Sequence, residues 1–348
     1  MGRARGERIR RPLIDVSASP SPVPLAPGDN ALVMKVRAGE RRALAKAITL
    51  IESTRREDQP RGQAVLAALL PHAVKSIRIG ISGAPGVGKS TFVEALGLHL
   101  INLGHRVAVL AVDPSSSVTG GSILADKTRM EELSRSPHAF IRPSPAGGSL
   151  GGVAARTRET LAVCEAAGFD VVIVETVGVG QSETAVARMT DLMVLLQLPN
   201  AGDDLQAIKK GIVEIADLVI INKADIDPRA TAVARSQWRN ALHMLRPASK
   251  NWAPPVITLS ALHKEGITDF WVQVEQYQAA LKPTGEFAAK RQHQSLSWMW
   301  QLIDSGLRQH FRQHRLVREN LPALTRSVEQ GHTTPAAAAY ALLDYLNH

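Results

Sequence analysis

The segment from Gly83 to Ser90 constrains the fold of this 348-residue chain more than any other feature. It reads Gly-Ala-Pro-Gly-Val-Gly-Lys-Ser and fits the pattern G-x-x-x-x-G-K-[ST], which needs a strand before it and a helix after it. An apolar run at Ile79–Ile81 leads into the segment, and a helix-like stretch at Thr91–Leu96 follows it. These flanks make a chance glycine-rich turn the weaker interpretation. The segment therefore predicts a phosphate-binding loop.

Backbone N–H groups and one lysine give such a loop its affinity for phosphate. Glycines avoid Cβ clashes, and successive N–H groups together with the helix N-terminus form an anion site. Lys89 is placed to reach the β- and γ-phosphates of a nucleotide, and the Ser90 hydroxyl to hold Mg²⁺. The residues expected to contact the nucleotide are Gly83, Ala84, Pro85, Gly86, Val87, Gly88, Lys89, Ser90 and Thr91.

Seven near-continuous apolar runs alternate with helical patterns between Ser76 and about Ala261. Such runs, separated by helices, are typical of a mostly parallel sheet that is covered on both faces. The expected fold class is therefore α/β, with ligands bound at the carboxyl ends of the strands. The expected strands are Ile79–Ser82, Val107–Val112, Phe140–Arg142, Val171–Val174, Leu192–Leu198, Leu218–Ile221 and Val256–Leu259.

Changes of pattern along the chain divide it into four regions. Residues 1–30 are an Arg-, Pro- and Ser-rich tail that is expected to be disordered, and residues 31–75 are a helical segment. Residues 76–265 are the nucleotide-binding domain, and residues 266–348 are a helical arm. The arm carries a dense apolar patch around Trp298 and Trp300. Such a patch packs either on its own domain or on a second subunit, and both alternatives stay open.

Charge and cysteine content exclude several classes of function. The net charge is +9, yet no basic stripe with interleaved aromatic residues indicates nucleic-acid binding. Cys164 is the single cysteine, which excludes an internal disulfide and a multi-cysteine metal site. No apolar stretch is long enough to span a membrane and no signal peptide is evident, so a cytoplasmic setting is expected. The Arg-rich start also resembles an organelle transit peptide, an alternative that Glu7 and Asp15 weaken.

The segment Asn222-Lys223-Ala224-Asp225 fits N-K-x-D, the pattern that selects guanine, and it directly follows an expected strand. A carboxylate at Asp225 accepts from both the ring N–H and the exocyclic amine of guanine, whereas adenine would leave it unpaired. Asn222 and Lys223 are expected to hold the loop and cover the base. Ser260, Ala261 and Leu262 end a later strand, where a backbone N–H commonly meets the guanine oxygen. The expected ligands are therefore GTP and GDP rather than ATP.

Glu175-Thr176-Val177-Gly178 occupies the place where GTPases usually have D-x-x-G. There the acid holds Mg²⁺ or a water on it, and the glycine N–H meets the γ-phosphate. The longer Glu side chain can reach the metal's water shell or the attacking water, and the alternative is a strand-end acid that caps a turn. Gln181 is displaced by two residues from the usual place of a water-orienting glutamine, which Val179 fills. Slow intrinsic hydrolysis and stimulation by a partner are therefore expected.

Three further charged residues are candidates for this site. Asp113 ends an expected strand and Asp126 lies in the segment after it. Because hard cations take oxygen ligands, both are candidates for the Mg²⁺ environment, against the alternatives of a turn acid and a helix-face charge. Lys209 lies in the acid- and lysine-rich stretch Asn200–Gly211, after another expected strand. That stretch is interpreted either as a capped surface helix or as a third switch that relays the nucleotide state.

Together these segments resemble the MeaB/ArgK-type GTPases, chaperones associated with methylmalonyl-CoA mutase. The resemblance covers roughly residues 35–300 and rests on Gly83–Thr91, Val112–Met130, Arg142–Pro145, Glu175–Glu183, Asn200–Gly211 and Asn222–Asp225. It implies a P-loop GTPase whose magnesium and hydrolysis site is formed by Ser90, Asp113, Asp126 and Glu175. It further implies that Lys209 acts in the third switch and that the C-terminal arm builds a homodimer. The expected catalytic residues are Lys89, Glu175, Asp113 and Lys209.

The same resemblance implies a client. Members of the family gate adenosylcobalamin loading of a B12-dependent acyl-CoA mutase and protect it from inactivation, with the cobalamin adenosyltransferase as a further candidate partner. Two alternatives are weaker. A nickel-type metallochaperone GTPase needs a Cys/His cluster that the sequence lacks, and a small-molecule or protein kinase gains no support from N-K-x-D.

Overall fold

The described chain folds into two compact units. The computed structural model describes residues 25–53, 55, 57–112, 130–143, 150–176, 182–199, 212–245 and 249–347. One unit falls within Met1–Lys75 and Glu159–Gly168, and the other within Ser76–Arg158 and Phe169–His348. The helix α7 (Leu150–Ala166) contributes its first half to the larger unit and its second half to the smaller one.

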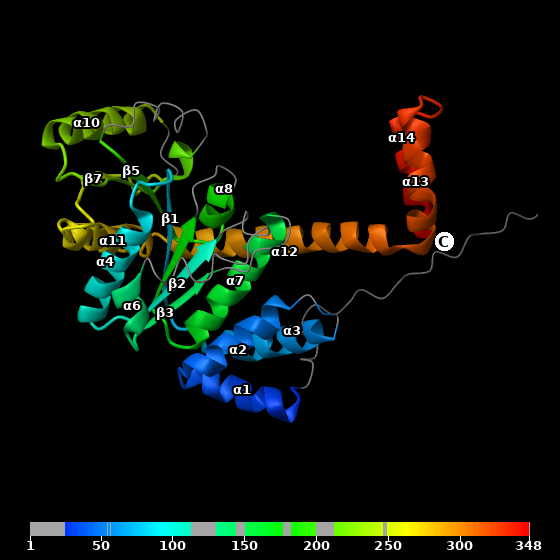
Figure 1. Cartoon of the computed structure of the whole chain (residues 1–348), viewed down its shortest axis with the longest axis horizontal. Helices are drawn as coiled ribbons and strands as arrows, with labels where there is room; N and C mark the ends of the chain where they lie inside the picture. Colours follow the sequence, from blue (N-terminus) through cyan, green and yellow to red (C-terminus); the bar gives the residue numbers. More distant parts are fainter. Residues whose placement is uncertain are drawn as a thin grey trace, which may run out of the picture. The chain divides into compact units, whose positions relative to one another are not determined.

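The larger unit is built on one sheet of seven strands in the order β3-β2-β4-β1-β5-β6-β7, which runs through the centre of Figure 1. Every pair of neighbouring strands is parallel. The strands are β1 (Ile77–Gly83), β2 (Val107–Val112), β3 (Ala139–Pro143), β4 (Val171–Thr176), β5 (Leu192–Gln197), β6 (Leu218–Ile221) and β7 (Val256–Thr258). Each contains or overlaps one of the seven apolar runs, so the expected α/β class with a mostly parallel sheet is confirmed.

Different helices cover the two faces of the sheet. Leu218 and Ile220 of β6 belong to the core that includes α4 (Lys89–Asn102) and α11 (Ile267–Leu281). Val219 and Ile221 alternate with them and pack instead with Trp238 of α10 (Pro228–Met244). Because successive side chains of a strand point to opposite faces, α4 and α11 lie on one side and α10 on the other (Figure 1). Burial on both faces explains why these strands read as continuous apolar runs.

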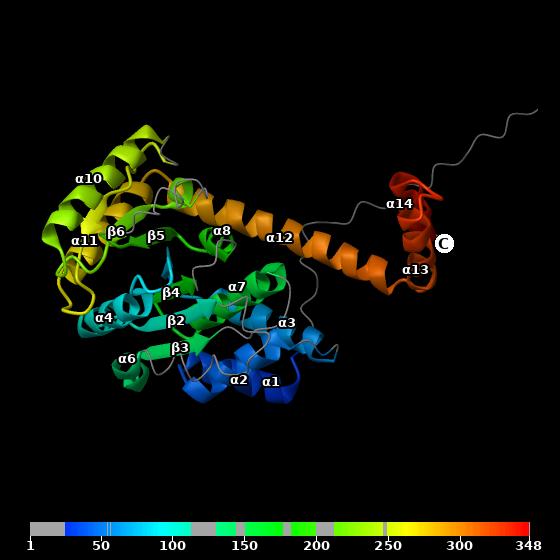
Figure 2. The same ribbon diagram turned by 45° about the horizontal axis from the view of Figure 1, so that its top comes forward.

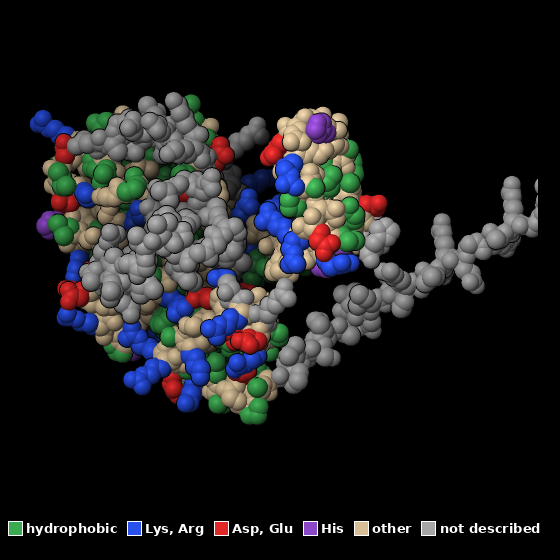
Figure 3. Space-filling model, turned by 45° about the vertical axis from the view of Figure 1, so that its right-hand side comes forward, with side chains coloured by type: hydrophobic (Ala, Val, Ile, Leu, Met, Phe, Trp, Pro, Cys, Tyr) green, Lys and Arg blue, Asp and Glu red, His purple; other side chains and the backbone are tan. Residues whose placement is uncertain are grey.

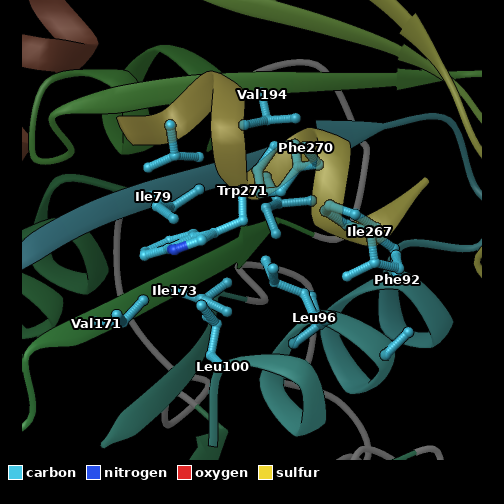
Figure 4. Packing of buried hydrophobic residues seen from close by; sticks show 14 of the residues in the cluster. Ile79, Phe92, Leu96, Leu100, Val171, Ile173, Val194, Ile267, Phe270 and Trp271 are labelled. Atoms are coloured by element: carbon cyan, nitrogen blue, oxygen red, sulfur yellow. The ribbon is translucent and has the colours of Figure 1, made fainter. Parts of the chain in front are cut away.

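Aromatic rings fill the core between α4, α11 and the sheet. Phe92 of α4 meets Phe270 of α11 edge to face, with ring centroids 5.1 Å apart. Figure 4 shows these rings together with Leu96, Trp271 and the strand residues Ile79 and Ile173, which belong to the same buried cluster. Since α4 begins at Lys89, this packing also fixes the helix that starts directly after the phosphate-binding loop.

Shorter elements complete the larger unit. They are α6 (Glu131–Arg135), α8 (Ser182–Ala187) and η2 (Val213–Ile215). After α11 the chain continues into α12 (Glu286–Gln313), α13 (Arg315–Glu329), α14 (Pro335–Asp344) and η3 (Tyr345–Asn347). None of the helices in the described part of the chain combines the length and the apolarity needed to cross a membrane.

Four apolar side chains on α12 share one face and are open to solvent. They lie at intervals of four, three and four residues, which places them along a single stripe of the helix. We call them the α12 stripe: Leu296, Trp300, Ile303 and Leu307, with exposed fractions of 58, 60, 39 and 62 %. Hydrophobic side chains are also visible on the surface of the helices that follow (Figure 3), where Tyr340 is 75 % exposed.

A buried ion pair fastens the start of α12 to the amino-terminal edge of the sheet. Asp191, directly before β5, is 1 % exposed and accepts two hydrogen bonds from Arg291, at 2.8 and 2.6 Å. The same guanidinium donates to the carbonyl of Ser76, and Asp191 also accepts from the backbone N–H of Arg78. Beside this pair, Lys290 donates to the Asp217 carboxylate at 3.0 Å. The pair therefore links α12 to β1 and β5 at once.

Where the smaller unit is described, its regular elements are all helices. These are α1 (Pro27–Arg37), α2 (Arg41–Glu52), α3 (Asp58–Leu69) and η1 (Leu70–His72), together with the second half of α7. Apolar residues at helical spacing are buried between them, such as Leu44 and Ile48, which lie four residues apart on α2. Helix α1 begins inside the stretch that was assigned to the tail, because Pro27 with its fixed φ suits a first helical position.

We expect the ion pair at α12 to stabilise the larger unit strongly. Replacing Arg291 by Met should lower the free energy of unfolding by about 3 kcal/mol, because the buried Asp191 carboxylate loses its charged partner. Urea denaturation measures the change. The matched control is Arg315→Met, which breaks an exposed pair with Glu319 on α13 and should change stability by less than about 1 kcal/mol. Equal effects of the two substitutions would contradict the importance of the buried pair.

Candidate functional site

The loop between β1 and α4 has the backbone geometry of a phosphate cradle. Gly86 and Gly88 have φ angles of 80° and 93°, which lie in the left-handed region that favours glycine. A Cβ atom on Gly88 would approach the Asn222 side-chain nitrogen to 2.6 Å, so this position has no space for a side chain. The glycines expected from the sequence are therefore required both by the turn and by a neighbouring loop.

Lys89 is held over this loop. Its exposed fraction is 8 %, and its ammonium group donates hydrogen bonds to the carbonyls of Gly83 at 2.8 Å and Ala84 at 3.1 Å. These bonds fold the side chain back along the loop from the first position of α4. The positive charge is thereby placed among the loop's backbone N–H groups, where an anion binds.

Ser90 and Glu175 meet across the sheet edge. The Ser90 hydroxyl donates to a carboxylate oxygen of Glu175 at 2.9 Å. Glu175 lies near the carboxyl end of β4, level with Ile81 of β1 and Ala111 of β2, and is 8 % exposed. A hydroxyl and a carboxylate side by side are a donor set that Mg²⁺ prefers, so these two residues fit the magnesium site expected from the sequence.

These residues line a pocket of about 490 Å³ at the carboxyl edge of the sheet. Its wall is formed by Pro85, Gly86, Gly88, Lys89, Ser90, Thr91, Ala111, Glu175, Thr176 and Lys223. The sequence did not single out Thr176. Thr176 is one of the lining residues, and its hydroxyl is buried and has no hydrogen-bond partner among the described residues. The sequence feature that could have indicated Thr176 as a site residue is its position directly after Glu175.

Asn222 joins three loops around the pocket. Its side-chain N–H donates to the carbonyl of Val87 in the phosphate loop at 2.8 Å. Its side-chain oxygen accepts from the backbone N–H of Ala261 at 3.1 Å. The residue is 1 % exposed, so neither bond competes with bulk water. The structure thus brings together the two motifs that the sequence assigned to phosphate and to base.

Asp225, the residue expected to bind guanine, lies two residues after the pocket-lining Lys223. A hydrogen bond from Ser260 lowers the pKa of Asp225, which keeps the carboxylate ionised and able to accept from guanine N–H groups. His263 lies 3.6 Å from the same carboxylate. Lys223 adopts the left-handed φ of 58°, and Leu262 is 72 % exposed beside Ala261. The segment that begins at Ser260, which was expected to bind the base, therefore contacts Asp225 through Ser260 and Asn222 through Ala261.

Three of the predicted site residues cannot be compared with this geometry. Asp113, Asp126 and Lys209 lie outside the described residues, as does the segment after Thr176 that contains Gln181. Their roles in metal binding, catalysis and switching stay predictions from the sequence.

The chain is similar in sequence to several known proteins over most of its length. A putative GTPase of Caulobacter vibrioides is 50 % identical over 90 % of this chain and 96 % of its own length. GTPase ArgK of Escherichia coli is 50 % identical over 80 % of this chain and 84 % of its own length. The mitochondrial methylmalonic aciduria type A homolog of Mus musculus is 47 % identical over 88 % of this chain and 76 % of its own length.

A solved structure and a family description agree with the sheet and the pocket. The crystal structure of a LAO/AO transport system kinase superposes with a TM-score of 0.74 at 37 % identity, covering 94 % of this chain and 100 % of that chain. Residues 44–315 match the family described as Methylmalonyl Co-A mutase-associated GTPase MeaB. The match takes in the phosphate loop, Glu175 and the guanine motif alike, so the chain is a P-loop GTPase and belongs to the MeaB family.

Proposed function

We propose that this GTPase is a chaperone of a B12-dependent acyl-CoA mutase of the methylmalonyl-CoA type, gating adenosylcobalamin loading and protecting the mutase from inactivation. The observation that carries the proposal is the pocket where Lys89, Ser90 and Glu175 converge, in a family described by its association with that mutase. A relative named after methylmalonic aciduria supports the same client. The cobalamin adenosyltransferase is a further partner within this proposal.

Phosphate binding in this mechanism rests on the loop and Lys89. The loop N–H groups and the N-terminus of α4 provide fixed positive partial charge for the β- and γ-phosphates. The Lys89 ammonium adds a full charge in a setting shielded from water, where electrostatic stabilisation of the leaving phosphate is stronger than in solvent. Because both are held before the nucleotide arrives, little reorganisation is needed during the reaction.

Ser90 and Glu175 are the described residues that would hold Mg²⁺. When bound, the ion neutralises charge that develops on the phosphates. Glu175 reaches Ser90 from the neighbouring strand β4 and is therefore also placed to orient a water at the γ-phosphate side of the loop. Asp113 and Asp126 complete the metal environment in this proposal, and Lys209 relays the nucleotide state to the partner.

Regulation by a partner follows from the hydrolysis segment. The residue after Gly178 is Val179, which has no polar group to hold a water, and Gln181 lies two residues further along. A site that lacks a water-orienting amide at the usual place turns over slowly until another group orders the water. We infer that binding of the mutase supplies this order, which makes hydrolysis report on the loading of the client.

We further propose that the protein is a homodimer that buries the α12 stripe. Four large apolar side chains on one helix face expose more apolar surface than isolated surface residues do. A second copy of the same stripe is self-complementary, as the interface of a symmetric dimer requires. Residues of this kind, and tryptophan above all, dominate the binding energy of such interfaces.

Hydrolysis with and without the mutase tests the proposed function. The basal rate of the purified protein should be low and should rise at least about tenfold when methylmalonyl-CoA mutase is added. Glu175→Gln should lower the stimulated rate about a hundredfold, because the carboxylate charge at the metal is lost. The control is Glu94→Gln, an acid on α4 that bonds the backbone N–H of Glu132 away from the pocket. A rate that the mutase leaves unchanged would refute the assigned client.

Nucleotide selectivity tests the role of Asp225. Asp225→Asn should weaken GDP binding by about 2 kcal/mol, or about thirtyfold, because a charged acceptor of guanine N–H groups is lost. The same variant should gain affinity for the xanthine nucleotide, whose carbonyl replaces the exocyclic amine and accepts from an amide. Asp227→Asn is the control, since this nearby acid caps α10 through the N–H of Ala230. Titration calorimetry with both nucleotides decides between the outcomes.

Sedimentation measurements test the dimer. Trp300→Glu should convert the protein to a monomer at micromolar concentration, because a charge at the centre of the stripe costs at least about 2 kcal/mol of association energy. Met244→Glu is the matched control, since this side chain is 85 % exposed on α10 and lies outside the stripe. A wild-type protein that sediments as a monomer would contradict the proposal.

A further inference from the structure

The C-terminal end of α8 is held by side chains from two other helices. Arg158 of α7 donates to the carbonyl of Arg188 at 2.8 Å. Gln294 of α12 donates to the carbonyls of Thr190 at 2.8 Å and Ala187 at 3.4 Å. Ala187 is the last residue of α8, and Arg188 and Thr190 follow it. Carbonyls at a helix end lack partners within the helix, so side chains of α7 and α12 bond them here. These three bonds would be lost or re-formed if the end of α8 moved relative to α7 and α12.

Arg158 also contacts α12, the helix that carries Gln294. It donates to the backbone carbonyl of Gln294 at 3.3 Å, and its guanidinium lies over the Trp298 ring at 5.8 Å. We call the set of Arg158, Arg188, Gln294 and Trp298 the Arg158 joint. In Figures 1 and 2, α7, α8 and the first part of α12 lie beside one another at this place. One side chain thus ties α7, α8 and α12 together.

Helix α8 also packs tightly against β1, the strand that leads into the phosphate loop. A Cβ on Gly80 of β1 would come within 2.8 Å of Val186, Thr190 and Met193 side-chain atoms. Val186 and Thr190 are fully buried, and no gap separates them from β1. Close-packed contacts of this kind transmit displacement rather than absorbing it. Gly80 lies three residues before Gly83, where the phosphate loop begins.

The buried charge of Arg158 lowers the stability of the fold, which is unusual for a contact that serves stability alone. Arg158 is 9 % exposed, and burial, followed by the charges of Arg188 and Arg78, lowers its pKa to about 10. A buried charge without an anionic partner lowers stability. In addition, Nε of Arg158, the side-chain oxygen of Gln294 and the indole N–H of Trp298 find no hydrogen-bond partner among the described residues. Unused bonding capacity allows the joint a second arrangement of bonds.

We infer that the Arg158 joint couples α12 to the nucleotide site, through α8 and the Gly80 contact with β1. Helix α8 follows β4, the strand that carries Glu175, and α12 carries the exposed stripe and leads into the C-terminal helices. The joint connects α12 to α8, whereas the Arg291–Asp191 pair connects α12 to the opposite, amino-terminal edge of the sheet. The nucleotide then biases the position of α12, and a partner bound to α12 biases the nucleotide site by the same amount. This inference rests on the proposed function only in identifying that partner as the second copy of the chain, which covers the α12 stripe in the proposed dimer.

Hydrogen exchange of the isolated protein tests the coupling without any partner. In the wild type, backbone amides of α12 around Gln294 should exchange differently with GDP and with a slowly hydrolysed GTP analogue. Arg158→Met keeps the apolar bulk but removes all three contacts, and should reduce this difference at least about fivefold. Arg235→Met is the matched control, because Arg235 also donates to a backbone carbonyl, that of Val256, but between α10 and β7. It should leave the difference in place.

Two outcomes overturn the inference: no nucleotide-dependent difference in wild-type α12, or a full difference in Arg158→Met. If Arg158→Met fails to fold, judged by circular dichroism, Gln294→Met carries the same expectation, because it removes only the bonds to the end of α8. Stimulation of hydrolysis by the mutase is measured in parallel. If the mutase does not change the hydrolysis rate of the wild type, the proposed client is refuted. The hydrogen-exchange difference would still show whether the Arg158 joint couples α12 to the nucleotide site.

Discussion

The two hydrogen bonds of the Asn222 amide hold the nucleotide pocket together. One reaches the phosphate loop at Val87, and the other reaches the loop after β7 at Ala261. A parallel sheet brings these loops to one edge but leaves their separation undefined, since each is fixed only by its own strand. A buried amide that donates to one loop and accepts from the other sets that separation. The distance between the phosphate end and the base end of the pocket therefore depends on one side chain, and the absence of a side chain at Gly88 makes room for it.

The parts of this structure that the sequence predicts are those with a local signature. Continuous apolar runs predict the strands because burial on both faces removes any alternation, and the phosphate loop is recognisable because its glycines are required by φ angles that other residues avoid. The substitution of Glu for Asp at position 175 also becomes understandable, because the longer side chain spans from β4 to Ser90. In these cases the residues that determine the local structure lie within a few positions of it in the sequence.

Contacts between distant segments leave no such signature. Arg291 and Asp191 are 100 residues apart, and Arg158 and Gln294 are 136 residues apart. Nothing in the spacing of either pair indicates that they meet, since a surface arginine and a buried one look alike in a sequence. Thr176 was overlooked for a related reason: a threonine at a strand end is common, and only its burial beside the pocket without a partner distinguishes it. Prediction therefore ends where tertiary packing decides which polar groups lose water.

Because α12 is long and is anchored near its start, a small rotation there moves its far end a large distance. Its ion pair and the α12 residues of the Arg158 joint lie within the first half of a helix of 28 residues. A helix rises about 1.5 Å per residue, so the stretch from Gln294 to Gln313 is about 28 Å long. A rotation of about 5° at the base would carry the far end through about 2.5 Å. This is close to the length of a hydrogen bond, so a tilt too small to disturb the core is large enough to open or close contacts at the other end of the lever.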